Sequence, residues 1–409
     1  MLKNHIALYL SNTESKGNII AQIQEGRLFK DLKTLRGVLF SEISLNRFIK
    51  EELTHGRFDV ETSTKNSLKN SSEGERKKAL LNHIISQNPE YIILDNVFGN
   101  LDVKAQTDIE NRLEALSNTV LLIQIANRKR DILPFIKTVY EVKNNTLFPF
   151  NIKEEENTAK TNFITVLPQP DKPFGNEINP IIKFNNVSVS YGERCILNTI
   201  NWEIKTGEFW QLIGPNGSGK STILSMIFGD NPKAFGQDIV LFGTKKGSGE
   251  SVWDIKQKIG YFSSEMLRGF TRLDSIGNMV VSGFFDTIGL YKTPTSAQIK
   301  IAQQWLEVLG MYDIRKKDFL SLSNGHQRLV LIARAMVKHP PLLILDEPTN
   351  GLDDHDAHLF CQLINKIAKE TQTTILYVSH RKEEYLLEPD FVYQLIPSKT
   401  GSVGSEKQQ

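Results

Sequence analysis

Two regions of this 409-residue chain repeat one pattern, and this internal repeat restricts the fold more than any other feature. In the first region Gly74 stands 21 positions before Asp95, and in the second Gly325 stands 21 positions before Asp346. A helical pattern follows each glycine, and each aspartate ends an apolar run that is typical of a buried strand. The equal spacing predicts two units built on one architecture.

The fold class follows from the order of strands and helices. After each aspartate a helical stretch leads to a second apolar strand, at Thr119–Ile125 and Thr373–Val378. The strand Phe209–Ile213 likewise precedes a helix over Ser221–Phe228. Short strands that alternate with helices predict an α/β fold, with a largely parallel sheet and helices on both faces.

Composition divides the chain into four segments. Residues 151–180 contain three consecutive glutamates and four prolines, which is typical of an irregular linker. They separate a truncated first domain, residues 1–150, from a complete second domain, residues 181–397. Residues 398–409 are polar and contain glycine and serine, so we predict a mobile tail there.

Bulk composition excludes several classes of protein. A hydrophobic fraction of 40% with 23% charged residues is typical of a globular chain. The formal charge of +2 and the lack of a basic stripe argue against a nucleic-acid partner. No apolar run reaches the roughly 18 residues of a spanning helix, so direct membrane insertion is not expected. Two distant cysteines, Cys195 and Cys361, fit a reducing, cytoplasmic compartment, and neither is expected to carry chemistry.

A glycine-rich loop follows the strand Phe209–Ile213 and precedes a helix. It matches the G-x-x-x-x-G-K-[ST] phosphate-binding pattern and consists of Gly214, Pro215, Asn216, Gly217, Ser218, Gly219, Lys220, Ser221 and Thr222. Glycines allow successive backbone N–H groups to surround phosphate oxygens, next to the positive end of the helix dipole. Lys220 would contact the β and γ phosphates, and Ser221 would bind Mg²⁺.

Acidic residues and a histidine follow the later strands. Asp346 and Glu347 end an apolar run, so their carboxylates emerge at the sheet edge where open α/β sheets bind ligands. Asp346 would hold Mg²⁺ through water, and Glu347 would polarise the attacking water. His380 follows the next strand and is a candidate γ-phosphate ligand. The predicted catalytic residues are therefore Glu347, His380 and Lys220.

The motifs between residues 181 and 395 resemble those of the ATP-binding-cassette ATPases. The phosphate loop, the Asp-Glu strand end, Asn350–Asp353 and Ser379–His380 occur in the family's order. A Leu-Ser-x-Gly-x-Gln signature containing Ser323 and Gly325 stands between the loop and the acidic strand. The resemblance implies hydrolysis of ATP with Mg²⁺, and it places Tyr191 where the family stacks an aromatic ring on adenine.

The first copy lacks the parts that hydrolysis needs. No phosphate-loop pattern occurs in residues 1–70, and at the spacing of the second copy the loop would lie before the chain begins. Asn96 stands in the place of Glu347, and Asn127 stands in the place of His380. We interpret the first copy as a degenerate cassette that does not bind ATP by itself.

Ser72 and Gly74 nevertheless preserve a signature in the first copy. In the cassette family the signature of one module closes over the phosphate loop of another, so the resemblance predicts one composite ATP site within the chain. An alternative is structural, because Ser72 and Glu75 have the spacing of a helix capping box. A second alternative is a homodimer, in which Ser323 and Gly325 of each chain serve the loop of the other.

The biological role rests on resemblance alone. The stretch Val281–Tyr291 and the helix through Trp305 resemble the helical subdomain of ModF-like cassette proteins, which are associated with molybdate uptake or photorepair. This predicts a transport-associated ATPase that docks on a membrane permease at the inner face of the plasma membrane. Ser264 argues against coupling, because the family has a glutamine there, although Glu265 is a candidate replacement. The alternatives are a regulatory or repair-associated ATPase without a permease and, third, a non-hydrolytic scaffold.

Overall fold

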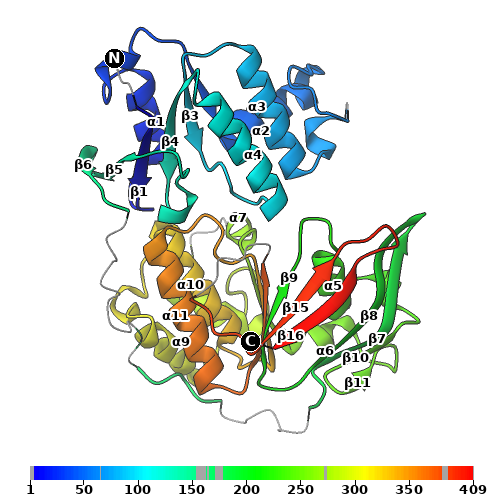
Figure 1. Cartoon of the computed structure of the whole chain (residues 1–409). Coiled ribbons are helices and arrows are strands. Elements are labelled where there is room, and N and C mark those ends of the chain that lie inside the picture. The colour runs from blue at the N-terminus through cyan, green and yellow to red at the C-terminus, as the bar shows by residue number, and fades with distance from the viewer. Residues whose placement is uncertain are drawn as a thin grey trace. The chain divides into compact units, whose positions relative to one another are not determined.

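The computed structural model of the chain contains two compact units (Figure 1). Unit 1 consists of Met1–Thr158 and Gly351–His355, and unit 2 consists of Ala159–Asn350 and Asp356–Gln409. The division after residue 158 falls inside the segment predicted as a linker. The structure describes residues 4–64, 66–152, 163, 165–170, 178–270, 274–379 and 386–408.

Unit 1 is built around a six-stranded sheet in the order β2-β3-β4-β1-β5-β6. The strands are β1 (Ile6–Leu10), β2 (Gly37–Phe40), β3 (Tyr91–Asp95), β4 (Leu121–Ala126), β5 (Thr138–Lys143) and β6 (Thr146–Pro149). All neighbours pair in parallel except β5 and β6. β1, β3 and β4 are almost wholly buried, which explains why their sequences are continuous apolar runs.

The helices of unit 1 begin where the sequence supplies a cap. They are α1 (Lys16–Gln24), α2 (Glu42–His55), α3 (Glu73–Ser86) and α4 (Val103–Leu116). Each follows a serine or aspartate whose side chain accepts a hydrogen bond from a first-turn N–H group; these residues are Ser15, Ser41, Ser72 and Asp102. α2 ends at His55 and is capped by Gly56, which adopts the left-handed conformation with φ of 62°.

Unit 2 has a six-stranded sheet in the order β12-β13-β14-β9-β15-β16. The strands are β9 (Phe209–Ile213), β12 (Ile259–Ser263), β13 (Leu342–Asp346), β14 (Thr374–Ser379), β15 (Phe391–Ile396) and β16 (Val403–Gln408). Every pair is parallel except β15 and β16. The prediction of an α/β fold with a largely parallel sheet is therefore confirmed for this sheet.

The prediction of a mobile tail over residues 398–409 is wrong. β16 pairs with β15 in an antiparallel register that extends from Ile396 opposite Val403 to Phe391 opposite Gln408. The connecting turn is closed by Ser398, whose hydroxyl donates to the carbonyl oxygen of Gly401 at 2.7 Å. Polar composition did not exclude a strand, because an edge strand is held by backbone hydrogen bonds on one side and tolerates polar side chains.

The two six-stranded sheets have the same order and the same strand directions. β1 occupies in unit 1 the place that β9 occupies in unit 2, and α1 follows it as α5 (Lys220–Ile227) follows β9. The first copy therefore contains the position of the loop, although not at the spacing of the second copy. The turn Ser11–Ser15 is at that position, and the chain between it and the signature is shorter than in unit 2.

The difference in length comes from two regions of unit 2 that are longer than the corresponding regions of unit 1, which lie between α1 and β2 and, with α2, between β2 and α3. One region of unit 2 lies between α5 and β12 and contains β10 (Asp238–Leu241) and β11 (Thr244–Lys245). These strands complete a sheet in the order β11-β10-β7-β8 with β7 (Ile182–Tyr191) and β8 (Arg194–Ile204), which precede the glycine-rich loop. The other is helical and lies between β12 and α10 (Asn324–Met336); it contains α7 (Met266–Gly269), α8 (Ile276–Val281) and α9 (Ser296–Val308). The spacing between the loop and the signature in the sequence could not show where these additional segments lie.

An aromatic cluster joins the two sheets of unit 2. The Trp202 ring on β8 stacks on the Tyr393 ring of β15 with 4.3 Å between centroids, and it meets the Trp210 ring edge-on at 5.6 Å. The Tyr393 hydroxyl also donates a hydrogen bond to the carbonyl oxygen of Asn201 at 2.9 Å. These contacts hold β8 against β9 and β15, the strands that flank the glycine-rich loop.

Two expectations from composition can be compared with the structure. No helix in the described part of the chain is long and apolar enough to cross a membrane. Cys195 and Cys361 are not joined by a disulfide bond.

Candidate nucleotide site

The glycine-rich loop Gly214–Gly219 connects β9 to α5 at the carboxyl edge of the main sheet of unit 2. Gly217 and Gly219 have left-handed backbone conformations, with φ of +77° and +100°. A Cβ atom on Gly219 would lie 2.5 Å from the Leu197 side chain, so both the backbone and its surroundings require glycine there. The residues predicted from the motif thus form one continuous loop and helix start.

Lys220 begins α5 and folds back over this loop. Its Nζ atom donates hydrogen bonds to the carbonyl oxygens of Gly214 at 2.7 Å and Pro215 at 3.2 Å. The hydroxyl of Ser218 is buried and has no hydrogen-bond partner within the described residues. A buried hydroxyl, an ammonium group and a helix N-terminus are together a donor set for an anionic ligand. The loop therefore fits the phosphate groups of a nucleotide.

Asp346 and Glu347 stand at the end of β13, between the ends of β12 and β14. Glu347 has a φ of +46°, in the left-handed region that non-glycine residues rarely adopt. Two hydrogen bonds hold it there: its N–H donates to the Val378 carbonyl oxygen at 2.9 Å, and Asn350 Nδ2 donates to its Oε2 at 3.0 Å. Backbone strain of this kind is concentrated at functional positions.

The pKa of the Asp346 carboxyl group is raised to about 6. Burial is the main cause, because it disfavours the ionised form, and the adjacent carboxylate of Glu347 is the second cause. The Lys220 ammonium group acts in the opposite direction and lowers this pKa. A carboxylate that is costly to ionise beside a second carboxylate gains from a divalent cation, so the pair fits Mg²⁺.

We expect Mg²⁺-dependent ATP binding to weaken as the pH falls through about 6, the pKa of Asp346. Mg²⁺ binds the ionised carboxylate, and each pH unit below the pKa lowers the ionised fraction about tenfold. Calorimetric titration with ATP, with and without Mg²⁺, on both sides of pH 6 measures the effect. Equal Mg²⁺ dependence on both sides would contradict it.

The stability of the ligand-free unit should change in the opposite sense. The folded-state pKa of Asp346 lies above its ordinary value, so the stability present at acid pH is lost as the pH rises through about 6. An Asp346→Asn variant removes this titration and is the control. Its denaturation midpoint should change less between acid and neutral pH than that of the wild type.

Tyr261 on β12 was not singled out from the sequence. It lies two positions before Ser263, which pairs with Asp346, and its hydroxyl makes a hydrogen bond to the Asp346 carboxylate that lowers the pKa of Asp346. Its ring packs edge-on against Phe228 at the end of α5, with 4.8 Å between centroids. Burial raises the pKa of the Tyr261 hydroxyl, which therefore remains a donor at neutral pH. The sequence signal that could have identified Tyr261 was the alternation of side chains along a strand, which places Tyr261 and Ser263 on the same face of β12.

Tyr191 ends β7 and has 47% of its surface exposed. Its hydroxyl accepts a hydrogen bond from Asn231 Nδ2 at 3.0 Å, and Asn231 Nδ2 also donates to Ser225 Oγ on α5 at 2.9 Å. The ring is thus tied by its polar end to the helix that follows the glycine-rich loop. An exposed ring on this tether can stack on a planar base.

The signature of unit 2 begins α10. Ser323 caps this helix, and its hydroxyl lies 2.8 Å from His326 Nδ1. A Cβ atom on Gly325 would lie 2.0 Å from the Asp356 side chain, so no larger residue fits without displacing that carboxylate. Gly325 therefore has a packing reason to be glycine, whatever its part in binding.

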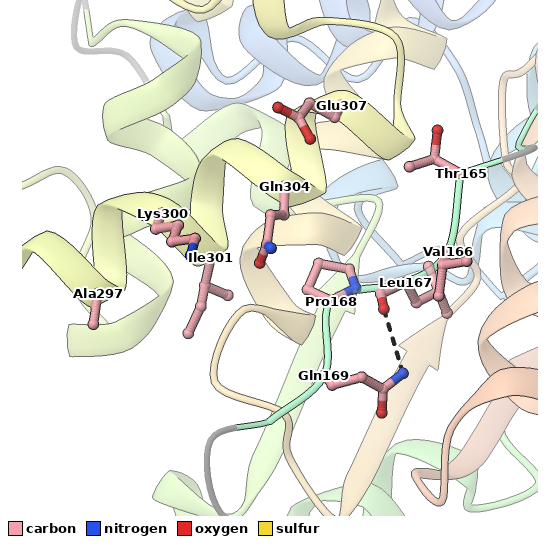
Figure 2. Close-up of a pocket in the computed structure, with 10 residues that line it drawn as sticks. All are labelled: Thr165, Val166, Leu167, Pro168, Gln169, Ala297, Lys300, Ile301, Gln304 and Glu307. Carbon is pink, nitrogen blue, oxygen red and sulfur yellow. Dashed lines mark hydrogen bonds between the residues drawn. The ribbon is translucent and has the colours of Figure 1, made fainter.

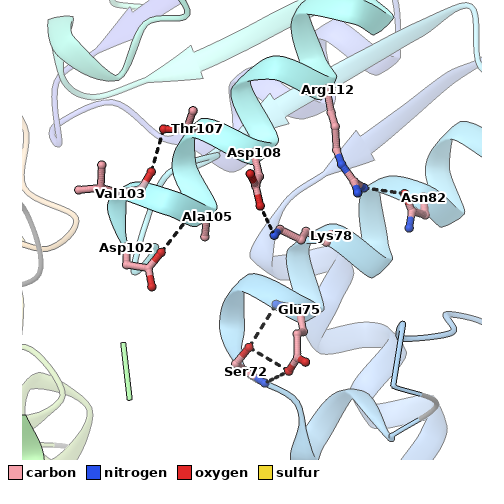
Figure 3. Close-up of polar contacts among 10 residues, drawn as sticks. All are labelled: Ser72, Glu75, Lys78, Asn82, Asp102, Val103, Ala105, Thr107, Asp108 and Arg112. Carbon is pink, nitrogen blue, oxygen red and sulfur yellow. Dashed lines mark hydrogen bonds and ion pairs between the residues drawn. The ribbon is translucent and has the colours of Figure 1, made fainter. Parts of the chain in front are cut away.

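The signature of unit 1 forms the capping box that its sequence allows (Figure 3). The Ser72 N–H and hydroxyl each lie 2.9 Å from Glu75 Oε2, and the Glu75 N–H donates to Ser72 Oγ at 3.3 Å. A Cβ atom on Gly74 would make only an ordinary contact, 3.4 Å from Ala105 Cβ. Ser72 is exposed, so the capping role does not bury its hydroxyl.

A basic residue three positions after each signature glycine is a further shared feature. In unit 1 the buried Lys77 donates through Nζ to the carbonyl oxygens of Asn96 at 2.9 Å and Gly99 at 2.7 Å. In unit 2 the buried Arg328 donates to the carbonyl oxygens of Pro348 and Asn350. Each cation therefore links a signature helix to the turn that follows the acidic strand. The equal position of the two basic residues in the repeat was the sequence signal that could have identified them.

Other predicted residues are placed as follows. His380 lies outside the described residues, and Ser379 before it ends β14. Ser264 is half-buried after β12, and the exposed Glu265 contributes to the raised pKa of Asp346. Asn127, at the place of His380 in the first copy, directly follows β4.

A cavity of about 560 Å³ lies elsewhere in unit 2 (Figure 2). Residues 165–169 form one wall and α9 forms the other, with Lys300, Gln304 and Glu307 projecting toward it. None of its lining residues belongs to the glycine-rich loop or to the acidic pair. The volume of a cavity therefore does not by itself locate the candidate nucleotide site of this chain.

Comparison with known proteins decides the family. The family described as ABC transporter matches residues 197–350. The ABC transporter ATP-binding protein ModF of Escherichia coli K12 is 40% identical over 329 residues, which are 76% of this chain and 67% of ModF. The chain belongs to the ATP-binding-cassette family. It is an ATP-binding ATPase of this class, as its motifs predicted.

Other cassette proteins match a smaller part of the chain. The zinc uptake system ATP-binding protein ZurA of Listeria innocua is 38% identical over 207 residues, 50% of this chain and 77% of ZurA. A solved structure of cbiO1 from Clostridium perfringens has a TM-score of 0.49 and 24% identity, and the match covers 56% of this chain and 88% of that one. The ModF match covers more of this cassette protein than unit 2 contains, so it includes residues of unit 1.

Proposed function

We propose that unit 2 binds Mg²⁺-ATP and hydrolyses it at the site formed by the glycine-rich loop and the end of β13. Its phosphate ligands are Gly214, Pro215, Asn216, Gly217, Ser218, Gly219, Lys220, Ser221 and Thr222. Ser221 and Asp346 hold Mg²⁺, and Tyr191 stacks on adenine. The observation that carries this proposal is the buried donor set of the loop, next to two carboxylates at the same sheet edge.

The residues of the site have separable roles. Lys220 exchanges its bonds to the loop carbonyl oxygens for bonds to phosphate oxygens, which gain negative charge during transfer. Glu347 accepts a hydrogen bond from the attacking water and orients it, while Asn350 holds the carboxylate in place. Mg²⁺, when bound, neutralises charge on the β and γ phosphates. His380 contacts the γ-phosphate.

Ser72 and Gly74 take part in closing the site, according to our proposal, as the surviving signature of a degenerate first cassette. The shared strand order of the two sheets and the exposed Ser72 hydroxyl support this role. Unit 1 itself has asparagine, Asn96 and Asn127, where hydrolysis needs glutamate and histidine. One ATP is then hydrolysed per chain.

We expect Gly74→Ala to lower steady-state ATPase activity about tenfold or more, because a methyl group at this helix start separates the N–H groups from a phosphate. The variant should still fold, since the new Cβ atom meets the Ala105 and Leu101 side chains only at ordinary distances of 3.4 and 3.9 Å. Ser72→Ala should act in the same direction, with a stability cost of about 1 kcal/mol from loss of the cap.

Ser41→Ala is the matched control for these variants. Ser41 caps α2 in the same unit, with 3.1 Å between its hydroxyl and the Ser44 N–H, so it loses a similar cap outside the signature. Its ATPase activity should stay within about twofold of wild type. Wild-type activity in Gly74→Ala, with ATP-driven dimerisation on size-exclusion chromatography, would instead support a homodimer closed by Ser323 and Gly325.

We propose further that the ATPase serves transport and docks on a membrane permease at the inner face of the plasma membrane. The names of ModF and ZurA, both ATP-binding components of transport systems, support this role. The resemblance of the sequence to cassette proteins associated with molybdate uptake makes an oxyanion such as molybdate the first substrate class to test. Ser264, a half-buried serine where a coupling glutamine is expected, favours the alternative of a regulatory or repair-associated ATPase.

Co-purification from membranes discriminates between these two roles. A transport subunit should co-purify with a permease, and the reconstituted permease should stimulate its ATPase activity. A protein that stays in the cytoplasmic fraction, and whose activity no permease changes, is the regulatory enzyme.

A further inference from the structure

Unit 1 has a lysine and an aspartate at the sheet positions that Lys220 and Asp346 occupy in unit 2. Lys16 begins α1 directly after the turn that follows β1, and Asp95 ends β3. β1 and β3 both pair in parallel with β4, so these ends lie at the same edge of the sheet. The Lys16 Nζ atom lies 3.0 Å from Asp95 Oδ1.

The turn between β1 and α1, Ser11–Ser15, differs from a phosphate-binding loop. It is one residue shorter than Gly214–Gly219, it contains no glycine, and none of its residues has a positive φ. Ser15 caps α1 by accepting from the Asn18 N–H, so a first-turn donor that would face a phosphate is already bonded. Two N–H groups of the turn are bonded as well, that of Asn12 to Asp353 Oδ2 at 2.7 Å and that of Glu14 to the Ser11 carbonyl oxygen at 3.1 Å.

Asn127 fastens this turn from the end of β4. Its Nδ2 atom donates to the Leu10 carbonyl oxygen at 3.0 Å and to Asn12 Oδ1 at 3.2 Å. This is the position at which unit 2 has His380, a candidate ligand of the nucleotide. In unit 1 the corresponding side chain bonds to protein.

The two lysines are used differently. Lys220 bonds to the carbonyl oxygens of Gly214 and Pro215 in its own loop. Lys16 instead reaches across to Asp95, which is only 8% exposed. A buried carboxylate requires a charged partner, because desolvation would otherwise disfavour its ionised form. The ion pair therefore neutralises both groups that would contact a phosphate and its Mg²⁺.

We propose that the Lys16–Asp95 ion pair is an internal substitute for nucleotide in unit 1. It holds the β1–α1 turn against the end of β3 in one conformation, whether or not ATP is present in the solution. Unit 1 is then a constant element, while the site of unit 2 alternates between free and bound states. The comparison with unit 2 rests on the proposed function, but the bond between Lys16 and Asp95 does not.

Hydrogen exchange measured by mass spectrometry on the full chain tests this proposal. In the Glu347→Gln background, Mg²⁺-ATP should protect peptides from the Gly214–Thr222 loop, whereas peptides 6–24 and 91–95 should change by less than about twofold. Protection of the unit 1 peptides by ATP would overturn the proposal. If neither the loop peptides nor the unit 1 peptides respond to ATP, the proposed nucleotide site has failed and not the ion pair.

A second arm needs no nucleotide. Lys16→Met leaves Asp95 buried without its cation, so exchange in peptides 6–24 and 91–95 should rise about tenfold. The double variant Lys16→Met with Asp95→Asn removes both charges, and its exchange should lie closer to wild type than that of Lys16→Met. An unchanged rate in Lys16→Met, or a double variant worse than the single one, would contradict the assignment.

The matched control is another lysine and aspartate pair of unit 1. Lys78 and Asp108 join α3 to α4 with 2.6 Å between Nζ and Oδ2, and both side chains are partly exposed (Figure 3). An exposed pair of this kind contributes little to stability. Lys78→Met should therefore change exchange in peptides 6–24 and 91–95 by less than about twofold.

Discussion

A Glu347→Gln variant should lose at least about 100-fold in the turnover number for ATP, while its affinity for ATP stays within a few-fold of wild type. Glutamine keeps the shape of the side chain and can still contact Asn350, but it does not accept a proton from water. Steady-state phosphate release and equilibrium binding of ATP measure the two quantities separately.

Glu265→Gln is the control for this variant. Glu265 is an exposed carboxylate that also raises the pKa of Asp346, so its loss changes the charge near the site without removing the proposed base. Its turnover should remain within a few-fold of wild type. If Glu347→Gln retains turnover, or if Glu265→Gln loses as much, then Glu347 is not the residue that orients the water.

Trp202→Ala should lower the free energy of unfolding of unit 2 by about 3 to 5 kcal/mol, as for other large buried aromatic residues. The ring is 2% exposed and contacts Tyr393 and Trp210, so its loss leaves a cavity between the two sheets. Its Nε1 atom has no hydrogen-bond partner in the described part of the chain, and removing that buried donor offsets a fraction of the cost.

Urea denaturation followed by circular dichroism measures this effect without relying on tryptophan fluorescence. Trp253→Ala is the control, because Trp253 is 74% exposed and its removal should change stability by no more than about 0.5 kcal/mol. Similar losses in the two variants would mean that the aromatic cluster does not join the sheets.

Three strands with largely apolar sequences were predicted to the residue, and the bounds of two others, β4 and β14, were predicted within one or two residues. β3, β9 and β13 match the runs Tyr91–Asp95, Phe209–Ile213 and Leu342–Asp346, because a strand buried on both faces admits few polar residues. The edge strand β16 was not predicted, because its sequence is not an apolar run. Its side chains are largely polar, and only its backbone pairing with β15 shows that it is a strand.

The site was predictable where its chemistry is local. The glycine-rich loop has a strand before it and a helix after it, as its motif requires, and the capping box at Ser72 forms as its spacing allows. Tyr261 was missed because its link to Asp346 joins strands that are far apart in the chain. The turn Ser11–Ser15 was missed because the inserted segments of unit 2 changed the spacing on which the prediction depended.

The sequence by itself determined the repeat, the α/β class and the identity of the loop, since each depends on residue types at short, regular spacing. Only the tertiary structure decided that β1 takes the place of β9, and that Lys16 reaches Asp95. It also decided how far burial and Glu347 raise the pKa of Asp346. These properties arise between residues that parallel pairing brings together at a sheet edge, and no local pattern specifies which distant strand becomes the neighbour.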